Sequence, residues 1–444
     1  MGKIPEYVGS VLWALERAGH EAWCVGGCVR DLHLGRTPED WDVTSSATPE
    51  EVMAVFGGCA LPTGIKHGTV TVQAGRGRVE VTTFRKDGVY LDHRRPETVT
   101  FTSSLEEDLR RRDFTINAMA MDLRGALRDP FGGMRDLKSG VLRCVGDPDS
   151  RFQEDALRLL RGMRFAAGMG LFVEEATEAS IHRNRELLRE IAAERIWSEL
   201  AKLLRGLQAA RVLREYPDVA GVFWPEILQM VGFDQKNPHH CYDVWEHTLH
   251  ALEAVPGDTV LRCTMLLHDV GKPLCFHLDE AGRGHFRGHP ACGAALAEKM
   301  LRRLKADNAT RESVVRLVEW HDRDIPRTDR GLRQALRVLG EQELRRLLAV
   351  KRADNLAQAP EYQMMQKEID RAEVILDKLL EDGACFTLRQ LAVRGEDLLE
   401  MGFRGPAVGK TLEMLLDAVV NEDLPNERRA LLEYARQVKG SMPV

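Results

Sequence analysis

The sequence predicts an α+β protein in which an N-terminal part with a mixed β-sheet is followed by a long helical part. Two alternating segments, Thr69–Val72 and Val79–Thr82, flank the turn residues Ala74–Gly77 and together predict a β-hairpin. The turn residues Asp129–Gly133 close this part of the chain. From about residue 150 onward strand alternation does not return, and turns containing Pro or Gly separate segments with helical periodicity.

Size and composition are those of an ordinary globular protein. The 444 residues allow roughly two to four domains. The sequence contains no apolar run of about 18 residues, so a membrane-spanning helix is not expected. The start, Met1–Glu6, lacks the apolar core of an export signal. Nine scattered cysteines form no paired C-x-x-C sites, which indicates reduced thiols and a cytoplasmic protein.

The charge is distributed unevenly along the chain. The net charge of −6 argues against a uniformly basic nucleic-acid-binding protein. Arginines nevertheless gather at 110–112 and again between 151 and 164. Such clusters leave room for a local basic groove that contacts a phosphate backbone.

A group of glycines and carboxylates near the N-terminus indicates phosphate chemistry. Gly26 and Gly27 let the backbone approach phosphates closely. Asp40 and Asp42 are two residues apart, so in a strand both would point to one side and offer the oxygen ligands that Mg²⁺ prefers. With Glu80 they could hold two Mg²⁺ ions for nucleotidyl transfer. Because Asp-x-Asp is also common in loops, a solvated turn with surface acids is the alternative interpretation.

Further motifs in order give this part of the chain a family resemblance. The segments Cys24–Asp31, Asp40–Asp42, Arg110–Ala118, Asp129–Leu137 and Arg151–Phe165 resemble the class II tRNA nucleotidyltransferases, the family of CCA-adding enzymes and poly(A) polymerases. The resemblance covers at least residues 20–205. It implies an enzyme with a nucleotidyltransferase head and a helical neck. It also implies Mg²⁺ held by the catalytic residues Asp40, Asp42 and Glu80.

The resemblance also implies a set of nucleotide-binding residues. Their expected tasks are to hold the triphosphate, shape the ribose region and read the base edge. They are Gly27, Arg30, Arg112, Asp113, Asn117, Asp155, Arg158, Arg161 and Arg164.

Asp155 and Arg158 provide a physical hypothesis for base selection. Three residues apart on a helix, they would be neighbours, one accepting hydrogen bonds and the other donating them. On the edge used in base pairing, cytosine and adenine each present an exocyclic amine beside a ring acceptor, whereas uracil and guanine do not present that order. The pair would therefore select C and A without a template. The alternative is that these side chains, together with Arg161 and Arg164, form a solvated face opposite the apolar arc of Ala156, Leu159, Leu160 and Met163.

A second set of residues indicates a metal site in the helical part. Imidazoles suit transition metals and a carboxylate can bridge them, so one or two such ions are expected. The six candidate ligands are His247, His268, Asp269, His289, His321 and Asp354. Their flanking residues resemble the HD superfamily of metal-dependent phosphohydrolases, which implies hydrolysis of a phosphate ester and a phosphate contact at Lys272. A single histidine is more often a surface or core residue than a metal ligand, which is the alternative interpretation. Five further histidines in the same region do not fit this series and have no assigned role: His239, His240, His250, His277 and His285.

The resemblance implies a division into four parts. These are a head at 1–140, a neck at 141–205, a helical region with the HD site at 206–360, and a tRNA-binding body and tail at 361–444.

A loop at Asp87–Thr98, with Tyr90, Asp92, Arg94 and Arg95, favours full CCA or terminal-A addition. The segment Gly405–Thr411 lacks the spacing of a P-loop and is expected to be a turn that opens a helix.

The expected function is the addition of C, C and A, from CTP and ATP, to tRNA 3′ ends, without a membrane partner. Three alternatives remain open from the sequence. The protein could add only the terminal A, or it could be a poly(A) polymerase. It could also be chiefly an HD phosphohydrolase whose head is an RNA-binding module. The sequence does not indicate an oligomeric state.

Overall fold

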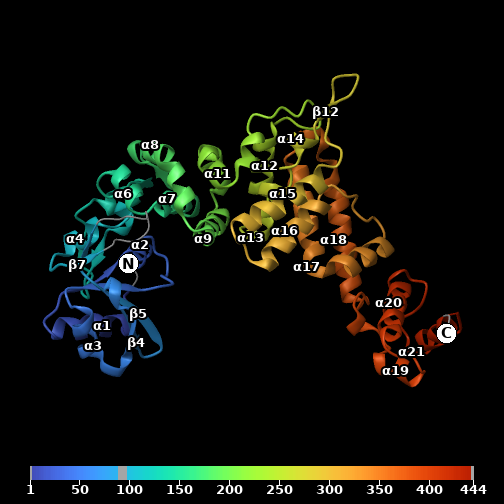
Figure 1. Cartoon of the computed structure of the whole chain (residues 1–444), viewed down its shortest axis with the longest axis horizontal. Coiled ribbons are helices and arrows are strands. Elements are labelled where there is room, and N and C mark those ends of the chain that lie inside the picture. The colour runs from blue at the N-terminus through green and yellow to red at the C-terminus, as the bar shows by residue number, and fades with distance from the viewer. Residues whose placement is uncertain (1–2, 89–97, 442–444) are drawn as a thin grey trace. The chain divides into compact units, whose positions relative to one another are not determined.

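The computed structural model describes residues 3–88 and 98–441, which divide into two compact units (Figure 1). Unit 1 holds residues 1–228 and 303–306, and unit 2 holds residues 229–302 and 307–444. Within the described ranges, every helix is too short or too polar to cross a lipid bilayer. The predicted loop residues Tyr90, Asp92, Arg94 and Arg95 lie outside the described residues.

Unit 1 contains the mixed sheet that the sequence predicts. Its seven strands run in the order β3-β4-β5-β2-β1-β8-β9, and β2 and β5 are parallel neighbours whereas the other pairs are antiparallel. The hairpin is confirmed, with Ala74 opposite Gly77 and Gly75 at a φ of 57° in the turn. The strands are β1 Ala22–Val25, β2 Asp42–Ser45, β3 Ala60–Gly64, β4 Thr69–Ala74, β5 Gly77–Thr83, β8 Ala120–Met121 and β9 Leu127–Arg128.

Helices α1 (Glu6–Arg17) and α3 (Pro49–Phe56) pack against the sheet and against each other, beside β4 and β5 in Figure 1. The apolar stripe of α1 is fully buried, with Val8, Leu12 and Leu15 all at 0% exposure. The remaining elements of the head are short. They are α2 Gly27–His33, β6 Arg85–Asp87, β7 Val99–Phe101, α4 Leu105–Arg110, the 3₁₀ turns η1 Gly57–Cys59, η2 Ile65–His67 and η3 Thr115–Asn117, and α5 Gly133–Lys138.

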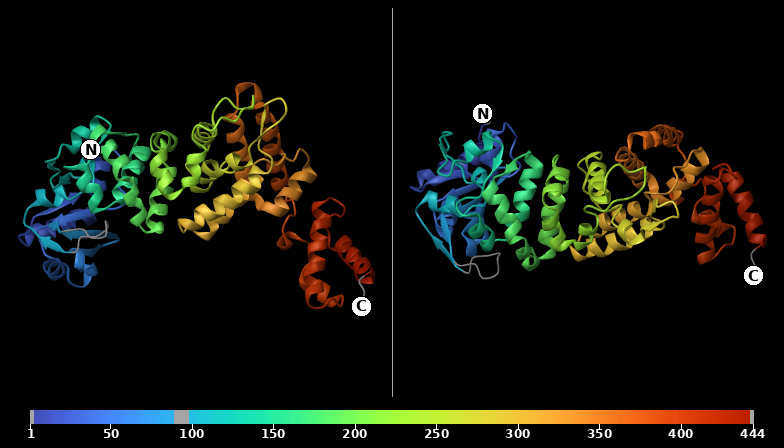
Figure 2. Two further views of the ribbon diagram at one scale, coloured as in Figure 1. Left: turned by 45° about the horizontal axis from the view of Figure 1, so that its top comes forward. Right: turned by 90° about the horizontal axis from the view of Figure 1, so that it is seen from above.

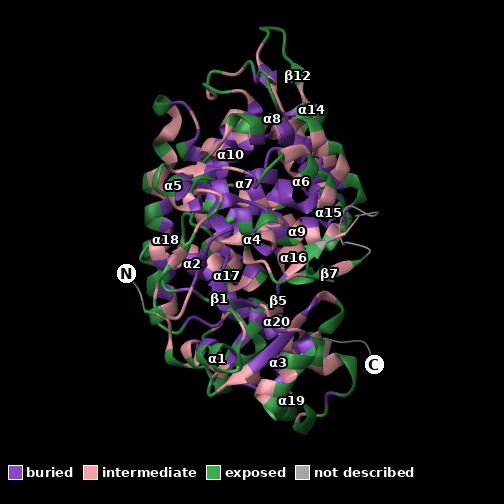
Figure 3. Ribbon diagram, turned by 90° about the vertical axis from the view of Figure 1, so that its left-hand side faces the viewer, coloured by how far each residue is buried: buried purple, intermediate pink, exposed green. Residues whose placement is uncertain are grey.

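Helices complete unit 1 after the head. Helix α7 is the most deeply packed of them, and Figure 3 shows much of it in the buried colour. It packs against α9, and the predicted apolar arc of Ala156, Leu159, Leu160 and Met163 is buried as expected. The elements are β10 Val141–Leu142, α6 Pro148–Glu154, α7 Leu157–Met169, β11 Phe172–Val173, α8 Glu175–Asn184, η4 Arg185–Glu190, α9 Ala193–Leu204, α10 Ala209–Glu215, α11 Pro217–Phe223 and η5 Pro225–Gln229.

The described residues of unit 2 form helices apart from one small hairpin. Helix α13 lies at its centre, because its residues Val260–Leu267 are all buried and it contacts α12, α16 and α17. Helix α17 is interrupted at Gly340, whose φ is 75°. The elements are α12 Val244–Glu253, α13 Thr259–Leu267, α14 Lys272–Cys275, β12 His277–Leu278, β13 Gly284–His285, α15 His289–Arg303, α16 Asn308–Trp320, α17 Asp329–Leu356, η6 Pro360–Met365 and α18 Gln366–Glu381.

The C-terminal helices bury an apolar cluster of their own. Helices α19 (Gly395–Glu400), α20 (Pro406–Val420) and α21 (Arg428–Ser441) pack on one another, drawn in red in Figure 2. Leu398, Leu415 and Leu431 lie at 0% exposure in this cluster. Gly405, at a φ of 55°, caps α20 just before Pro406, which confirms the predicted turn at the start of a helix.

Candidate active site and metal centre

The three carboxylates predicted to hold Mg²⁺ meet at one edge of β2. Asp42 is the first residue of β2, and Glu80 lies directly opposite it on the parallel strand β5. Asp40 lies just before the strand rather than in it, so the predicted strand alternation holds only from Asp42 onward. All three are accessible to solvent, and no ion-pair partner for them occurs within residues 3–88 and 98–441.

The electrostatics of this cluster favour a cation. Desolvation by the surrounding residues raises the pKa of the Asp42 carboxyl; Arg112 opposes this shift, while Glu80 and Asp40 add to it. Like charges so close together repel unless a positive charge lies between them. Carboxylate oxygens are the ligands that Mg²⁺ takes, so the donor set fits this ion.

The glycine pair forms the turn into α2, close to an arginine. Gly26 has a φ of 80°, a conformation that side chains with a Cβ rarely adopt. A Cβ on Gly26 would also lie 3.1 Å from Nη1 of Arg112. The turn therefore brings bare backbone and a guanidinium to the same place, as binding of a triphosphate requires.

A hydrogen-bonded chain connects four of the predicted nucleotide-binding residues. Arg30 Nη1 donates to Asn117 Oδ1 at 2.7 Å, and Asn117 Nδ2 donates to Asp113 Oδ1 at 3.1 Å. Arg161 donates from Nε and Nη2 to Asp113 Oδ2 at 2.8 and 2.6 Å. Burial opposes ionisation of Asp113, but Arg161 and Asn117 hold the pKa of its carboxyl below the ordinary value. The chain thus links α2, η3 and α7.

The expectation that Asp155 and Arg158 share one helix is wrong. Helix α6 ends at Glu154, Asp155 is extended with φ −138° and ψ 102°, and α7 starts at Leu157. The cause is local: Asp155 Oδ1 accepts a hydrogen bond from Leu157 N at 3.2 Å, which competes with continuation of the helix. The two residues still meet through Arg158 N, which donates to Asp155 O at 2.9 Å.

The side chains of this pair have separate partners. Asp155 Oδ2 lies 3.4 Å from Arg195 Nη2. Arg158 is buried and donates to Glu154 Oε2 at 2.6 Å and to the carbonyl of Arg111 at 2.8 Å. Asp155 and Arg158 therefore lie side by side without forming an ion pair with each other.

The arginines of α7 do not form a free solvated face. Arg158, Arg161 and Arg164 are paired with carboxylates from three different segments, namely Glu154, Asp113 and Glu199. Arg164 Nε lies 2.6 Å from Glu199 Oε2. This finding removes the alternative in which α7 simply exposes its charges to water.

Sequence reasoning missed the aromatic ring on which these arginines converge. Phe165, at 7% exposure, has the guanidinium carbons of Arg30, Arg161 and Arg164 at 5.3, 5.4 and 4.1 Å from its ring centroid. Phe165 follows Arg161 by four residues, so helical spacing could have indicated this contact. Glu199 gave no such signal, because it comes from another helix.

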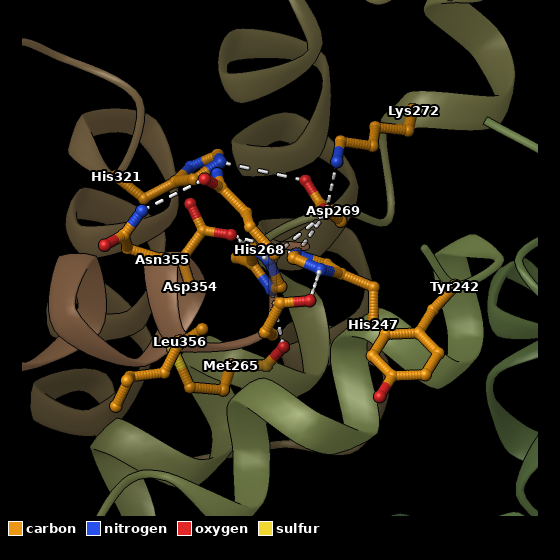
Figure 4. A network of polar contacts seen from close by, with 12 residues as sticks. Tyr242, His247, Met265, His268, Asp269, Lys272, His321, Asp354, Asn355 and Leu356 are labelled. Carbon is orange, nitrogen blue, oxygen red and sulfur yellow. Dashed lines mark hydrogen bonds and ion pairs between the residues drawn. The ribbon is translucent and has the colours of Figure 1, made fainter. Parts of the chain in front are cut away.

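The six predicted metal ligands come together in unit 2, and Figure 4 shows most of them in one network. They fall into two groups, His247–His268–Asp354 and Asp269–His289–His321. Asp269 connects the groups. Its Oδ2 lies 3.4 and 3.2 Å from Nε2 of His247 and His268. Its Oδ1 lies 3.5 and 3.8 Å from Nε2 of His289 and His321.

The histidine tautomers are set by backbone carbonyls. Each imidazole of the cluster places Nδ1 near a carbonyl oxygen, which can only accept a hydrogen bond. These contacts are His247 to Ala357 at 3.2 Å, His268 to Met265 at 2.7 Å, His289 to Phe286 at 2.9 Å and His321 to Val318 at 2.6 Å. Every Nε2 is therefore left to face the cluster, the arrangement that orients metal-ligating histidines. The Nε2 atoms of His289 and His321 are only 3.2 Å apart, so the donor set fits a shared cation.

Charges within the cluster are strongly coupled. Burial lowers the pKa of His321 to about 3. Burial also acts on His268, but the Asp269 carboxylate outweighs it and raises the pKa of His268 to about 10. Lys272, at 5% exposure, places Nζ 2.7 Å from Asp269 Oδ2 and donates to Gln235 Oε1 at 2.9 Å. The lysine that the HD resemblance implies as a phosphate contact therefore faces into the protein.

Comparisons with known proteins agree with this geometry. The model described as Poly A polymerase head domain matches residues 22–143. The models described as Probable RNA and SrmB- binding site of polymerase A and tRNA nucleotidyltransferase domain 2 putative match residues 170–217 and 292–435. The fold and the carboxylate site thus define a nucleotidyltransferase with a polymerase-type head.

Curated relatives extend the match over nearly the whole chain. The CCA-adding enzyme of Lactobacillus helveticus (strain DPC 4571) is 35% identical over 439 residues, covering 96% of this chain and 95% of that protein. The CCA-adding enzyme of Geobacillus kaustophilus (strain HTA426) is 35% identical over 435 residues, with 96% and 95% covered. The crystal structure of the Bacillus stearothermophilus CCA-adding enzyme in complex with CTP aligns at a TM-score of 0.68 and 31% identity, covering 99% and 100%. The chain belongs to the CCA-adding enzymes, which are tRNA nucleotidyltransferases.

Proposed function

We propose that this protein adds the complete CCA sequence to tRNA 3′ ends, with CTP and ATP as donors and the terminal 3′-hydroxyl of tRNA as the attacking group. The observation that carries the proposal is the assembly of Asp42 and Glu80 at one strand pair beside the Arg30–Asn117–Asp113–Arg161 chain. The relative crystallised with CTP supports a cytidine donor. Free thiols at all nine cysteines accord with work in a reducing cytoplasm, the location that we propose.

The residues of the head divide the work of nucleotidyl transfer. Asp40, Asp42 and Glu80 would hold Mg²⁺, which supplies charge stabilisation for the attacking and leaving oxygens when bound. Gly27, Arg30 and Arg112 bind the triphosphate through bare backbone and guanidinium groups. Asp113 and Asn117 form the wall beside the ribose, held in place by Arg161.

Base selection falls to Asp155 and Arg158 at the break between α6 and α7. The base edge would take over the contacts that these side chains make with Arg195 and Glu154. Because Asp155 is extended and lies before α7 rather than within it, its carboxylate is not confined to a helical face. Arg161 and Arg164, stacked around Phe165, support the phosphates and the nucleotide.

The test supplies three tRNA transcripts that end in the discriminator base, in C and in CC. Labelled nucleotides are added singly and then as CTP with ATP, in the presence of Mg²⁺. Growth of the shortest transcript to CCA without use of UTP or GTP is expected. Extension of the CC-ended transcript alone, by a single A, would show an A-adding enzyme instead, and an unbounded A tail would show a poly(A) polymerase. The double variant Asp40→Ala, Asp42→Ala should abolish every extension.

A second function is supported by the histidine–aspartate cluster. We propose that it hydrolyses phosphate esters such as 2′,3′-cyclic phosphates at RNA ends. His247, His268 and Asp354 would hold one divalent metal and His289 and His321 another, with Asp269 between them; bound metal supplies an activated water at neutral pH. Asp269 is suited to this task because its two oxygens face different groups of ligands.

Separate variants distinguish the two functions. The metal-loaded protein is assayed with bis-p-nitrophenyl phosphate and with a 2′,3′-cyclic nucleotide. The double variant His268→Ala, Asp269→Ala should lose this hydrolysis and retain CCA addition, and the head variant should show the reverse. Loss of one activity in both variants would contradict a two-site enzyme. If the unmodified, metal-loaded protein hydrolyses neither substrate, the head is the only active site.

The four parts expected from the sequence enter this proposal as functional divisions. The head at 1–140 performs the transfer, and the neck at 141–205 selects the base. Residues 206–360 carry the HD site, and the body and tail at 361–444 bind tRNA.

A further inference from the structure

His240 lies beside the histidine–aspartate cluster but belongs to neither group of ligands. Its ring meets the His247 ring edge-on, with centroids 5.1 Å apart and an interplanar angle of 87°. Its ring contact with His247 places it next to the cluster, on the segment that precedes α12, and Lys272, Asp269 and Asp354 are further charged groups near it.

The backbone that carries His240 is held on both sides. His240 N donates to Asn237 O at 3.0 Å, and Asn237 Nδ2 donates to Gly284 O at 3.0 Å. On the other side of the segment, Ala359 N donates to His239 O at 3.0 Å. These bonds tie the segment to β13 and to the end of α17. The ring of His240 is thus presented from a fixed backbone rather than from a free loop.

One nitrogen of the His240 ring lacks a hydrogen-bond partner among the described residues. Nδ1 of His240 is buried and has no partner among the residues that the structure describes. In contrast, each histidine of the cluster has a carbonyl at Nδ1. Buried polar atoms in native proteins are normally paired, so an unpaired one next to a metal centre calls for a ligand.

The contacts of Lys272 indicate which side chain could bind a phosphate group at the cluster. Lys272 already contacts Asp269 and Gln235 at 2.7 and 2.9 Å, and its side chain is 6% exposed. A phosphate ester at the cluster would therefore find Lys272 engaged and His240 uncommitted. A neutral imidazole carries one N–H, which matches the acceptor oxygens of a phosphoryl group.

We propose that His240 donates a hydrogen bond to a phosphoryl oxygen of the ester bound at the cluster, and that it is a substrate-contact residue rather than a metal ligand. The proposal rests on the phosphohydrolase function proposed above. It adds a specific group that recognises the phosphate.

The experiment compares three variants of the full-length, metal-loaded protein. His240→Ala removes the donor, and His240→Asn keeps an N–H near the position of Nδ1. His277→Ala is the matched control, because the His277 ring is exposed on β12 and stacks only on His285 among the described rings. Metal content, the inhibition constant of inorganic phosphate, and KM and kcat for bis-p-nitrophenyl phosphate are measured for each.

The expected result is an unchanged metal content with phosphate binding weakened about tenfold or more in His240→Ala, the usual effect of losing a hydrogen bond to a charged group. KM should rise by a similar factor, His240→Asn should recover much of the loss, and His277→Ala should match the wild type. Phosphate binding equal to wild type in His240→Ala would overturn the proposal. So would loss of metal from that variant, since it would make His240 part of the metal centre. If the wild type binds phosphate through His240 but hydrolyses nothing, the contact stands and only the hydrolase function fails.

Discussion

The exchange Asp113→Asn tests the carboxylate that ties α7 to the head. Asparagine keeps an oxygen for the Phe114 N–H, which now donates to Asp113 Oδ1 at 2.8 Å. It replaces the oxygen that accepts two N–H groups of Arg161 with an amide that can itself only donate. Breaking one side of a buried ion pair costs about 3–5 kcal/mol. Since the Arg161 side chain is 34% exposed, water recovers part of this, and we expect the lower end, about 3 kcal/mol.

Hydrogen exchange measured by mass spectrometry on the full-length protein can locate this loss. A local destabilisation of about 3 kcal/mol corresponds to amide exchange roughly 150-fold faster in peptides that span α7. Peptides that span α20, in the other unit, provide the internal reference. The control variant is Glu106→Gln, which removes a surface pair with Arg110 whose side chains are 56% and 63% exposed, and it should change exchange little.

Two results would refute this reasoning. If exchange in α7 were no faster in Asp113→Asn than in Glu106→Gln, the ion pair with Arg161 would contribute nothing to the position of α7. If α20 accelerated as much as α7, the substitution would act through the whole chain rather than through the contact described.

Three further outcomes follow from the structure. Gly26→Ala should raise KM for CTP about tenfold in steady-state assays, because a residue with a Cβ is strained at a φ of 80°. The added Cβ would also lie 3.1 Å from Nη1 of Arg112. An unchanged KM would contradict this. Asp113 has a lowered pKa in the folded protein, so its stabilising effect is complete above about pH 4 and is lost as pH falls toward the folded pKa. The free energy of urea unfolding between about pH 2 and 4 should therefore depend more steeply on pH for wild type than for Asp113→Asn, and equal slopes would disprove the assignment. His289→Ala should lower metal content from about two ions per chain to about one by elemental analysis, while His277→Ala keeps both.

The gathering of the histidine–aspartate cluster could be predicted from the sequence. The structure brings together the six residues that the sequence predicts as ligands, and that prediction rests on their order along the chain and on flanks that resemble the HD superfamily. The sequence could not show where each side chain lies within the cluster. The bridging position of Asp269 and the inward turn of Lys272 depend on contacts such as that with Gln235, which is 37 residues away.

The nucleotide site was less predictable because local side-chain chemistry overrode periodicity. The pattern of apolar residues runs smoothly through Asp155, yet its carboxylate bonds to Leu157 N and breaks the helix there. Likewise Asp40 falls outside β2, since the strand begins only where pairing with β5 starts at Asp42. Partners such as Glu199 come from elements whose approach is set by packing, which single-sequence patterns do not encode.

The three carboxylate partners of α7 fix the angular position of its side chains about the helix axis. This restricts which insertions and deletions the sequence can accept during evolution. One residue inserted in an α-helix turns everything beyond it by about 100°. An insertion between Arg158 and Arg161 would swing Arg161 away from Asp113 and Arg164 away from Glu199 together, and it would carry Phe165 out of its cluster of arginines. We therefore expect length changes to accumulate in the turns on either side of α7 and to be absent within it. The length of α7 therefore stays constant, and with it the spacing of the side chains that contact the head and the remainder of unit 1.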